Sequence, residues 1–296
     1  MDQKEIALLG GTQGIGRQCL LLMLIKGLKV RVLARNPSML SSLNEKYSHL
    51  LTIVKGDATR EEDVAKLIAP SVDHVLCALG ARLNEPTTII ESGVNNALKA
   101  MKKLDKEMRF VMVTSNGVLE AGVNWFYDNI MKKHLLNHFY DDMTRAEKAL
   151  KQLTENSKIS YAIVRPPQLI DAPATLELIH GEGEYYPHGT HLVTREDVGA
   201  FMIECLFNEN LTKGNREFNL NTTKVLETKI DNMQTLKSIM PYPKYLMIRL
   251  FIFSVMTGIG SLSAFALYKI KSLLFPSIDI SKIISSWLIK SLESNK

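Results

Sequence analysis

Short apolar and β-branched runs alternate with longer segments of helical period over roughly the first 220 residues of this chain. Six runs are predicted to be strands: Ile6–Leu9, Lys29–Ala34, Leu51–Lys55, His74–Leu79, Arg109–Thr114 and Ser160–Arg165. Helices are predicted between them, at about 15–26, 61–69, 86–103 and 138–155. This alternation is typical of βαβ units, whose right-handed crossovers place helices on both faces of a sheet. We therefore predict an α/β protein with a doubly wound parallel sheet.

The composition and net charge limit which classes of function are expected for this chain. The hydrophobic fraction of 46% and the charged fraction of 23% are those of a folded protein. The net charge is +5, and no basic run is interleaved with aromatic residues, so no nucleic-acid partner is expected. The cysteines Cys19, Cys77 and Cys205 are odd in number and far apart, which favours reduced, packed thiols. The N-terminal residues lack a secretory-signal pattern, and we expect a cytoplasmic domain.

A glycine-rich turn follows the first predicted strand and opens the first predicted helix. Its residues are Gly10, Gly11, Thr12, Gln13, Gly14, Ile15 and Gly16. In such a turn the glycines allow a sharp bend and let the bare backbone approach a pyrophosphate, which the N–H groups and the helix dipole attract. The strand before the turn and the helix after it are the context that supports a dinucleotide site.

Arg35 follows the second predicted strand, about 20 residues after the glycines. An acidic residue at this place binds the ribose hydroxyl of NAD, whereas an arginine suits the 2′-phosphate of NADP. The alternative is a solvated surface arginine. The expected cofactor is NADP(H), bound in a Rossmann-type domain.

Further motifs occur in a consistent order along the chain. They are the glycine turn, Leu33–Arg35, Gly56–Asp57, Leu79–Arg82, Pro86–Thr88, Val113–Ser115, Asp141–Asp142 with Arg145, Tyr161–Pro167 and Leu192–Val198. Together they resemble the NmrA-like group of atypical short-chain dehydrogenases, which includes biliverdin-IXβ reductase, also called flavin reductase. The resemblance covers about residues 5–220. The turn departs from the group's usual spacing, because Gln13 stands at its middle position and Gly14 follows.

The resemblance implies roles for individual residues. The glycine turn would hold the pyrophosphate, and Arg35 the 2′-phosphate. The remaining cofactor contacts would come from Asp57 and Ala58 at the adenine, from Leu79, Gly80 and Arg82 at the middle of the cofactor, and from Pro166 at the nicotinamide end. Ser115 would lie beside the nicotinamide and the substrate, as the catalytic residue.

General acid catalysis is not expected from this sequence. Short-chain dehydrogenases use a Tyr-x-x-x-Lys pair, in which the lysine lowers the pKa of the tyrosine. Here Tyr140 is followed four residues later by Thr144, so a packing role for the tyrosine is favoured. Ser115 is the better polar candidate: it either hydrogen-bonds an acceptor or caps a loop.

The histidines offer weaker patterns. His134 and His138 have a zinc-compatible spacing but no third ligand, so no metal site is expected. Three further histidines, His180, His188 and His191, flank the turn-rich stretch Gly181–Pro187, predicted to be a hairpin loop. That loop either contacts substrate or is a plain connection.

Beyond the predicted domain at 1–225, a linker is predicted at 226–244 and a hydrophobic C-terminal helical tail at 245–296. Leu250–Tyr268 contains 19 uncharged residues, which as a helix would extend about 29 Å, close to the roughly 30 Å of a hydrocarbon core. The tail is expected to tether the protein to a membrane; the alternative is a helix packed on the domain.

Two functions remain open at this point. The first is an NADPH-dependent reductase that transfers hydride to a planar or hydrophobic small molecule, such as a flavin, quinone or tetrapyrrole. The second is a redox-sensing regulator or assembly factor that binds NADP(H) without turnover. The missing tyrosine–lysine pair favours the second, and the intact cofactor turn with Ser115 favours the first. An epimerase is disfavoured, since epimerases keep that pair.

Overall fold

The computed structural model describes residues 4–81, 86–119, 136–183 and 192–223 of the chain. The chain divides into two units, Met1–Glu227 and Thr228–Lys296, and all described residues belong to the first. The predicted linker and tail therefore lie outside the described residues. Among the helices that are described, none combines the length and the apolar character needed to cross a bilayer.

Eight strands of the described residues form the main sheet, in the order β3-β2-β1-β4-β5-β6-β10-β8. Their bounds are β1 Glu5–Leu9, β2 Lys29–Ala34, β3 Leu51–Lys55, β4 Val72–Cys77, β5 Met108–Val113, β6 Ile159–Arg165, β8 Leu178–Glu182 and β10 Arg216–Thr222. Every neighbouring pair is parallel except β10 with β8, which is antiparallel. The expected Rossmann-like α/β fold is confirmed, with a mostly parallel sheet. The strand order reverses between β1 and β4, where such sheets bind their ligands.

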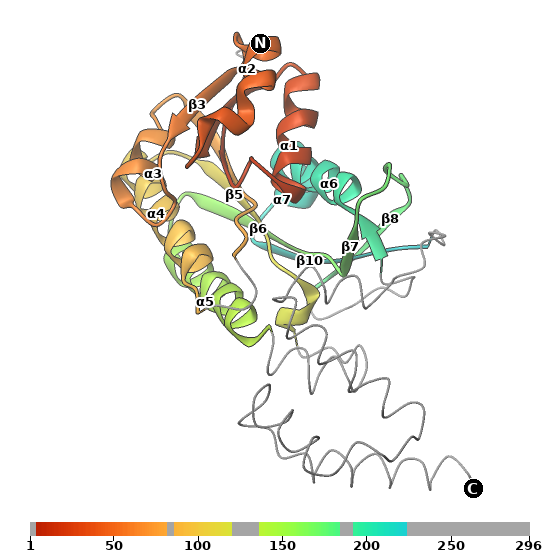
Figure 1. The fold of residues 1–296 in the computed structure, drawn as a ribbon. Coiled ribbons are helices and arrows are strands. Elements are labelled where there is room, and N and C mark those ends of the chain that lie inside the picture. The colour runs from red at the N-terminus through yellow and green to blue at the C-terminus, as the bar shows by residue number, and fades with distance from the viewer. Residues whose placement is uncertain (1–3, 82–85, 120–135, 184–191, 224–296) are drawn as a thin grey trace, which may run out of the picture. The chain divides into compact units, whose positions relative to one another are not determined.

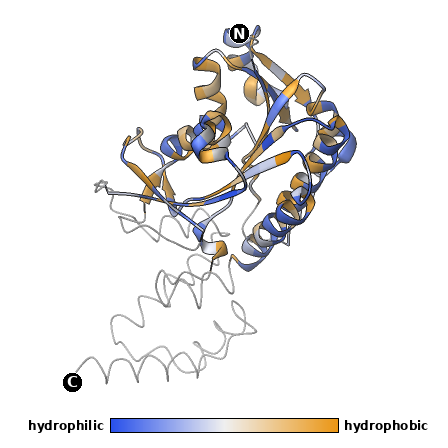
Figure 2. Ribbon diagram, turned by 180° about the vertical axis from the view of Figure 1, so that it is seen from behind, coloured by the Kyte–Doolittle hydropathy of each residue, from blue (hydrophilic) through white to orange (hydrophobic). Residues whose placement is uncertain are grey.

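Helices cover both faces of this sheet (Figure 1). One face carries α1 Gly14–Ile25, α2 Ser41–Tyr47 and α6 Arg195–Phe207; the other carries α3 Glu61–Leu67, α4 Ile89–Leu104 and α5 Asn137–Thr154. Strand periodicity explains this arrangement, because alternate residues point to opposite faces. In β6, for example, Ala162 and Val164 join the core with α1 and α6, while Arg165 points toward α5. Figure 2 shows apolar strands inside and polar outer faces on α4 and α5.

Shorter elements complete the described part. They are the 3-10 helices η1 Pro37–Leu40 and η2 Asn116–Val118, the four-residue helix α7 Glu209–Thr212, and a small sheet of β7 Gln168–Ile170 with β9 Leu192–Thr194. The hairpin loop expected around His180 is partly wrong. His180 and Gly181 belong to strand β8, because they pair with Leu220 and Asn219 of β10, whereas residues 184–191 lie outside the described residues.

Candidate functional site

The turn after β1 is shaped by two glycines with positive φ. Gly10 has φ +83°, and a Cβ there would strike the backbone carbonyl of Ala78 at the end of β4. Gly14 has φ +55°, but no described atom lies within 4 Å of a Cβ placed there. The first position therefore requires glycine for the fold. At the second, glycine leaves open space above the start of α1.

The N-terminus of α1 has the properties of an anion site. Gln13 precedes the helix without forming a side-chain cap, and the first turn contains no acidic residue. Backbone N–H groups at the start of a helix lack partners within the helix, and the helix dipole adds partial positive charge there. Within the described residues, no side chain competes for these donors, which suits them to a phosphate oxygen. Gly11 and Ile15 are buried in this turn, while Thr12, Gln13 and Gly14 are more accessible.

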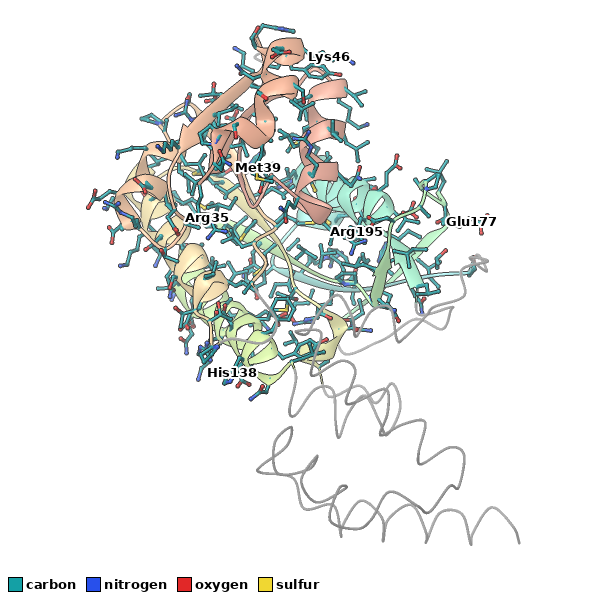
Figure 3. All side chains as sticks on the ribbon, viewed as in Figure 1. Arg35, Met39, Lys46, His138, Glu177 and Arg195 are labelled. Atoms are coloured by element: carbon teal, nitrogen blue, oxygen red, sulfur yellow. The ribbon has the colours of Figure 1, made fainter. Side chains whose placement is uncertain are left out.

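Arg35 lies directly after β2, at the same end of the sheet as the glycine turn. Its side chain is exposed, as is that of Met39 in η1 (Figure 3). Among the described residues, none forms a hydrogen bond or an ion pair with the Arg35 guanidinium. A charged, unengaged guanidinium beside an open helix N-terminus can receive a second phosphate.

Asp57 and Ala58 form the loop after β3, and two buried side chains hold this loop. The Asp57 carboxylate accepts hydrogen bonds from the backbone N–H and the hydroxyl of Thr59, at 2.9 and 2.8 Å. The Thr59 N–H holds the pKa of the Asp57 carboxyl below its usual range against partial burial, and the charge of Arg35 contributes. Asp63 accepts the Asp57 N–H at 3.0 Å, and Asn96 of α4 donates its amide to the Ala58 carbonyl at 2.9 Å. No sequence pattern predicted that Asp63 and Asn96 would hold this loop.

The segment after β4 is described only in part. Leu79 packs over Gly93 of α4, where a Cβ would strike the leucine side chain and approach Ala58. Gly80 is exposed, with open space at its Cα. Arg82 lies outside the described residues. Leu79 and Ala58 are therefore neighbours, both packed beside Gly93 of α4.

Ser115 follows β5 and caps a turn. Its hydroxyl oxygen accepts the N–H of Gly117 at 3.3 Å, at the start of η2. This bond uses a lone pair and leaves the hydroxyl proton available, because a serine hydroxyl both accepts and donates. The next residue, Asn116, donates its N–H to the carbonyl of buried Pro166 at 3.1 Å. The structure thus brings the Ser115 and Pro166 segments together. The capping role expected as one alternative for Ser115 is observed, and no described residue accepts a hydrogen bond from the hydroxyl of this half-buried side chain.

Tyr140 has the surroundings of a packing residue. Only 7% of its surface is exposed. Its ring packs so closely on Gly117 that a Cβ there would lie 2.5 Å from two ring carbons. The Thr144 hydroxyl, one helical turn later, bonds back to the Tyr140 carbonyl at 2.8 Å. Thr144 occupies the position that the lysine has in the tyrosine–lysine pair.

Other chemically active side chains do not assemble into a site. No group of three His, Cys, Asp or Glu residues suited to a metal occurs among the described residues; His134, His188 and His191 lie outside them. His138 is exposed, and the His180 ring packs against Phe201 and Phe218. All three cysteines are free and buried. Burial raises the pKa of Cys19 and of Cys77 to about 12 and raises that of Cys205 further. They are therefore poor nucleophiles.

Comparison with known proteins identifies the family. A sequence profile described as NAD(P)H-binding matches residues 10–209, from the glycine turn through α6. The chain belongs to the NAD(P)H-binding family. The NAD(P)H-binding domain inferred from the sequence is thereby confirmed.

Individual relatives agree with this assignment. Reductase pytE of Aspergillus terreus is 26% identical over 242 residues, covering 69% of this chain and 92% of the relative. Among solved structures, ChuY, an anaerobillin reductase from Escherichia coli, superposes with a TM-score of 0.60 at 21% identity, covering 76% of this chain and all of that one. A short-chain dehydrogenase/reductase from Veillonella parvula in complex with NADP gives a TM-score of 0.55 at 16% identity, over 73% and 94% of the two chains. These similarities describe an NAD(P)H-binding protein of the reductase type.

Proposed function

We propose that the protein is an NADPH-dependent reductase that delivers hydride to a planar or hydrophobic acceptor of the flavin, quinone or tetrapyrrole class. The observation that carries the proposal is a pair of cationic features at the same end of the sheet, the N-terminus of α1 and the Arg35 guanidinium, neither of which has a side-chain partner among the described residues. A dinucleotide with an extra 2′-phosphate supplies the anionic groups that match both features.

Each residue of the site then has a physical task. The N–H groups of Gly10 to Gly16 donate to the pyrophosphate, and Arg35 pairs with the 2′-phosphate. The loop held by Asp63 and Asn96 places Asp57 and Ala58 beside the adenine. Leu79 and Gly80 would contact the middle of the cofactor, and Ser115 and Pro166 its reacting end.

NADPH supplies the hydride when it is bound, so the protein has only to position and shield the acceptor. Ser115 can donate its free hydroxyl proton as a hydrogen bond to a polar atom of the acceptor, which orients the acceptor. Among the described residues, no group with an activated proton faces Ser115, since Tyr140 is packed against Gly117. Water therefore supplies the proton, which suits acceptors whose reduced form is readily protonated. The resemblance in fold to an anaerobillin reductase favours a tetrapyrrole-like member of this class.

The test is NADPH oxidation by the purified protein with a panel of flavins, quinones and linear tetrapyrroles. We expect turnover with at least one class. The Ser115→Ala variant should have a lower kcat while its Kd for NADPH changes little, because the hydroxyl contacts the acceptor and not the phosphates. If every acceptor that is turned over shows an unchanged kcat, Ser115 only caps η2.

A second function is favoured by one observation, the packed Tyr140 without its lysine. A chain that binds NADPH but lacks a proton donor can serve as a redox-sensing regulator. Tight NADPH binding combined with no oxidation by any acceptor of the panel would support this alternative over the reductase.

A further inference from the structure

A buried chain of charged and polar side chains links the segments that follow β5 and β6. Arg165, at the end of β6, is 1% exposed and bonds to Glu147 of α5 through Nε at 3.0 Å and Nη2 at 2.6 Å. Nη2 also contacts Glu217 of β10 at 2.6 Å, and Glu217 pairs with Lys151 near the surface. Glu147, in turn, accepts the hydroxyl of Thr114 at 2.6 Å. One carboxylate thus joins the ends of β5 and β6.

The positions of these residues connect the chain to the site. Thr114 directly precedes Ser115, and Arg165 directly precedes Pro166. The two loops are already joined by the bond from the Asn116 N–H to the Pro166 carbonyl. Glu147 joins the same two segments from the helix side. The loops are therefore fixed at two points, by a direct backbone bond and through the Glu147 carboxylate.

The same helix supports the turn a second time. Tyr140 and Glu147 are two helical turns apart on the buried face of α5. Tyr140 packs on Gly117 within η2, and Glu147 holds Thr114 immediately before it. Helix α5 therefore fixes both the position of η2 and the direction of the chain that enters it.

Burial makes this arrangement rigid and costly to disturb. Glu147 is 5% exposed, and buried charges persist only where partners and hydrogen bonds compensate for lost hydration. Among the described residues, Arg165 Nη1 has no hydrogen-bond partner, and Glu147 and Glu217 hold the guanidinium through Nε and Nη2. Such a network locks side chains and their neighbouring backbone into one geometry.

We propose that Glu147 is a positioning residue: through Thr114 and Arg165 it sets how Ser115 and Pro166 are placed around the reacting end of the cofactor. It touches neither cofactor nor acceptor. This inference rests on the proposed function for its effect on turnover, but its effect on the bound cofactor can be measured independently. Small misplacements of reacting groups reduce reaction rates strongly, so the loss of this positioning should produce a measurable fall in kcat.

The sharpest variant is Thr114→Val, which removes the bond to Glu147 and leaves the ion pairs intact. We expect kcat to fall about tenfold with the Kd for NADPH within about twofold of the wild type. Thr114→Ser restores the hydroxyl and should restore kcat. Glu147→Gln is expected to lower kcat similarly and also to lower the melting temperature, because Arg165 loses a charged partner.

Glu217→Gln is the matched control. This substitution removes a carboxylate partner of the same Arg165 guanidinium, but Glu217 has no bond to Thr114. The variant should therefore be less stable and keep its kcat within about twofold of the wild type. Equal losses of kcat in Thr114→Val and Glu217→Gln would overturn the proposal. So would a Thr114→Val variant with wild-type kcat, or one that Thr114→Ser does not rescue.

A second readout separates this inference from the proposed function. The fluorescence lifetime of bound NADPH reports the surroundings of its nicotinamide without any turnover. Thr114→Val and Glu147→Gln should change this lifetime, whereas Thr114→Ser and Glu217→Gln should match the wild type. If the wild type oxidises no NADPH, the proposed function fails and the lifetimes decide the inference. Identical lifetimes in all variants would refute it.

Discussion

Replacing Gly14 with alanine separates the role of the glycine turn in folding from its role in binding. Gly14 has φ +55°, a conformation that costs an alanine roughly 1–2 kcal/mol. No described atom lies within 4 Å of the added methyl, so no clash adds to this cost. The free energy of unfolding should therefore fall by about 1 kcal/mol, which corresponds to a Tm lower by roughly 2–4 °C for a domain of this size. The variant is expected to fold.

Its NADPH binding should nevertheless be damaged. The methyl group would stand in the open space above the N-terminus of α1, where the pyrophosphate has to approach the backbone N–H groups. We expect the Kd for NADPH to rise at least about tenfold, equivalent to about 1.4 kcal/mol.

Gly27 provides the control. It has φ +74°, and a methyl there also meets nothing within 4 Å. It follows the far end of α1, about 18 Å from the turn at 1.5 Å per residue. Gly27→Ala should lower the Tm as much as Gly14→Ala and leave NADPH binding unchanged. Thermal melting without cofactor and calorimetric titration with NADPH measure the two effects. Equal NADPH affinity in the two variants would refute the assignment of the turn.

Three further predictions concern other parts of the chain. The wild type should bind NADPH at least about tenfold more tightly than NADH, and Arg35→Ala should remove most of that preference in titrations with both cofactors; equal wild-type affinities would contradict this. Burial lowers the pKa of His74 to about 4 from its ordinary 6.5. Because the unfolded chain takes up this proton first, stability should fall as the pH drops from about 6.5 to 4, and His74→Gln should flatten that decline in urea titrations; parallel curves would exclude His74 as the cause. A chain truncated near residue 240 should stay soluble and bind NADPH, while the full chain should sediment with membranes; a full chain that is soluble without detergent would show the tail to be a packed helix.

Local sequence patterns were sufficient to predict the strands and the cofactor turn. All six predicted strands are present within two residues at either end, because apolar runs between breakers depend on near neighbours in the chain. The sequence indicated α6 only through the motif Leu192–Val198 of the family resemblance, and no helix was predicted there. The buried residues of α6 occur around most of the helix, which packs against both α1 and the sheet, so no amphipathic stripe marked it. Strand β10 was missed as well, since its polar Asn219 and Asn221 are buried.

The amino-acid sequence by itself determined the α/β class, the glycine turn and the arginine that follows β2, since each depends on residues adjacent in the chain. Only the tertiary structure showed that Ser115 caps η2, because that role depends on the bond from the Gly117 N–H to its hydroxyl oxygen. The link from Thr114 through Glu147 to Arg165 joins residues 33 and 18 positions apart. No periodicity records such a link, because it exists only after the sheet order has brought α5 across the ends of β5 and β6.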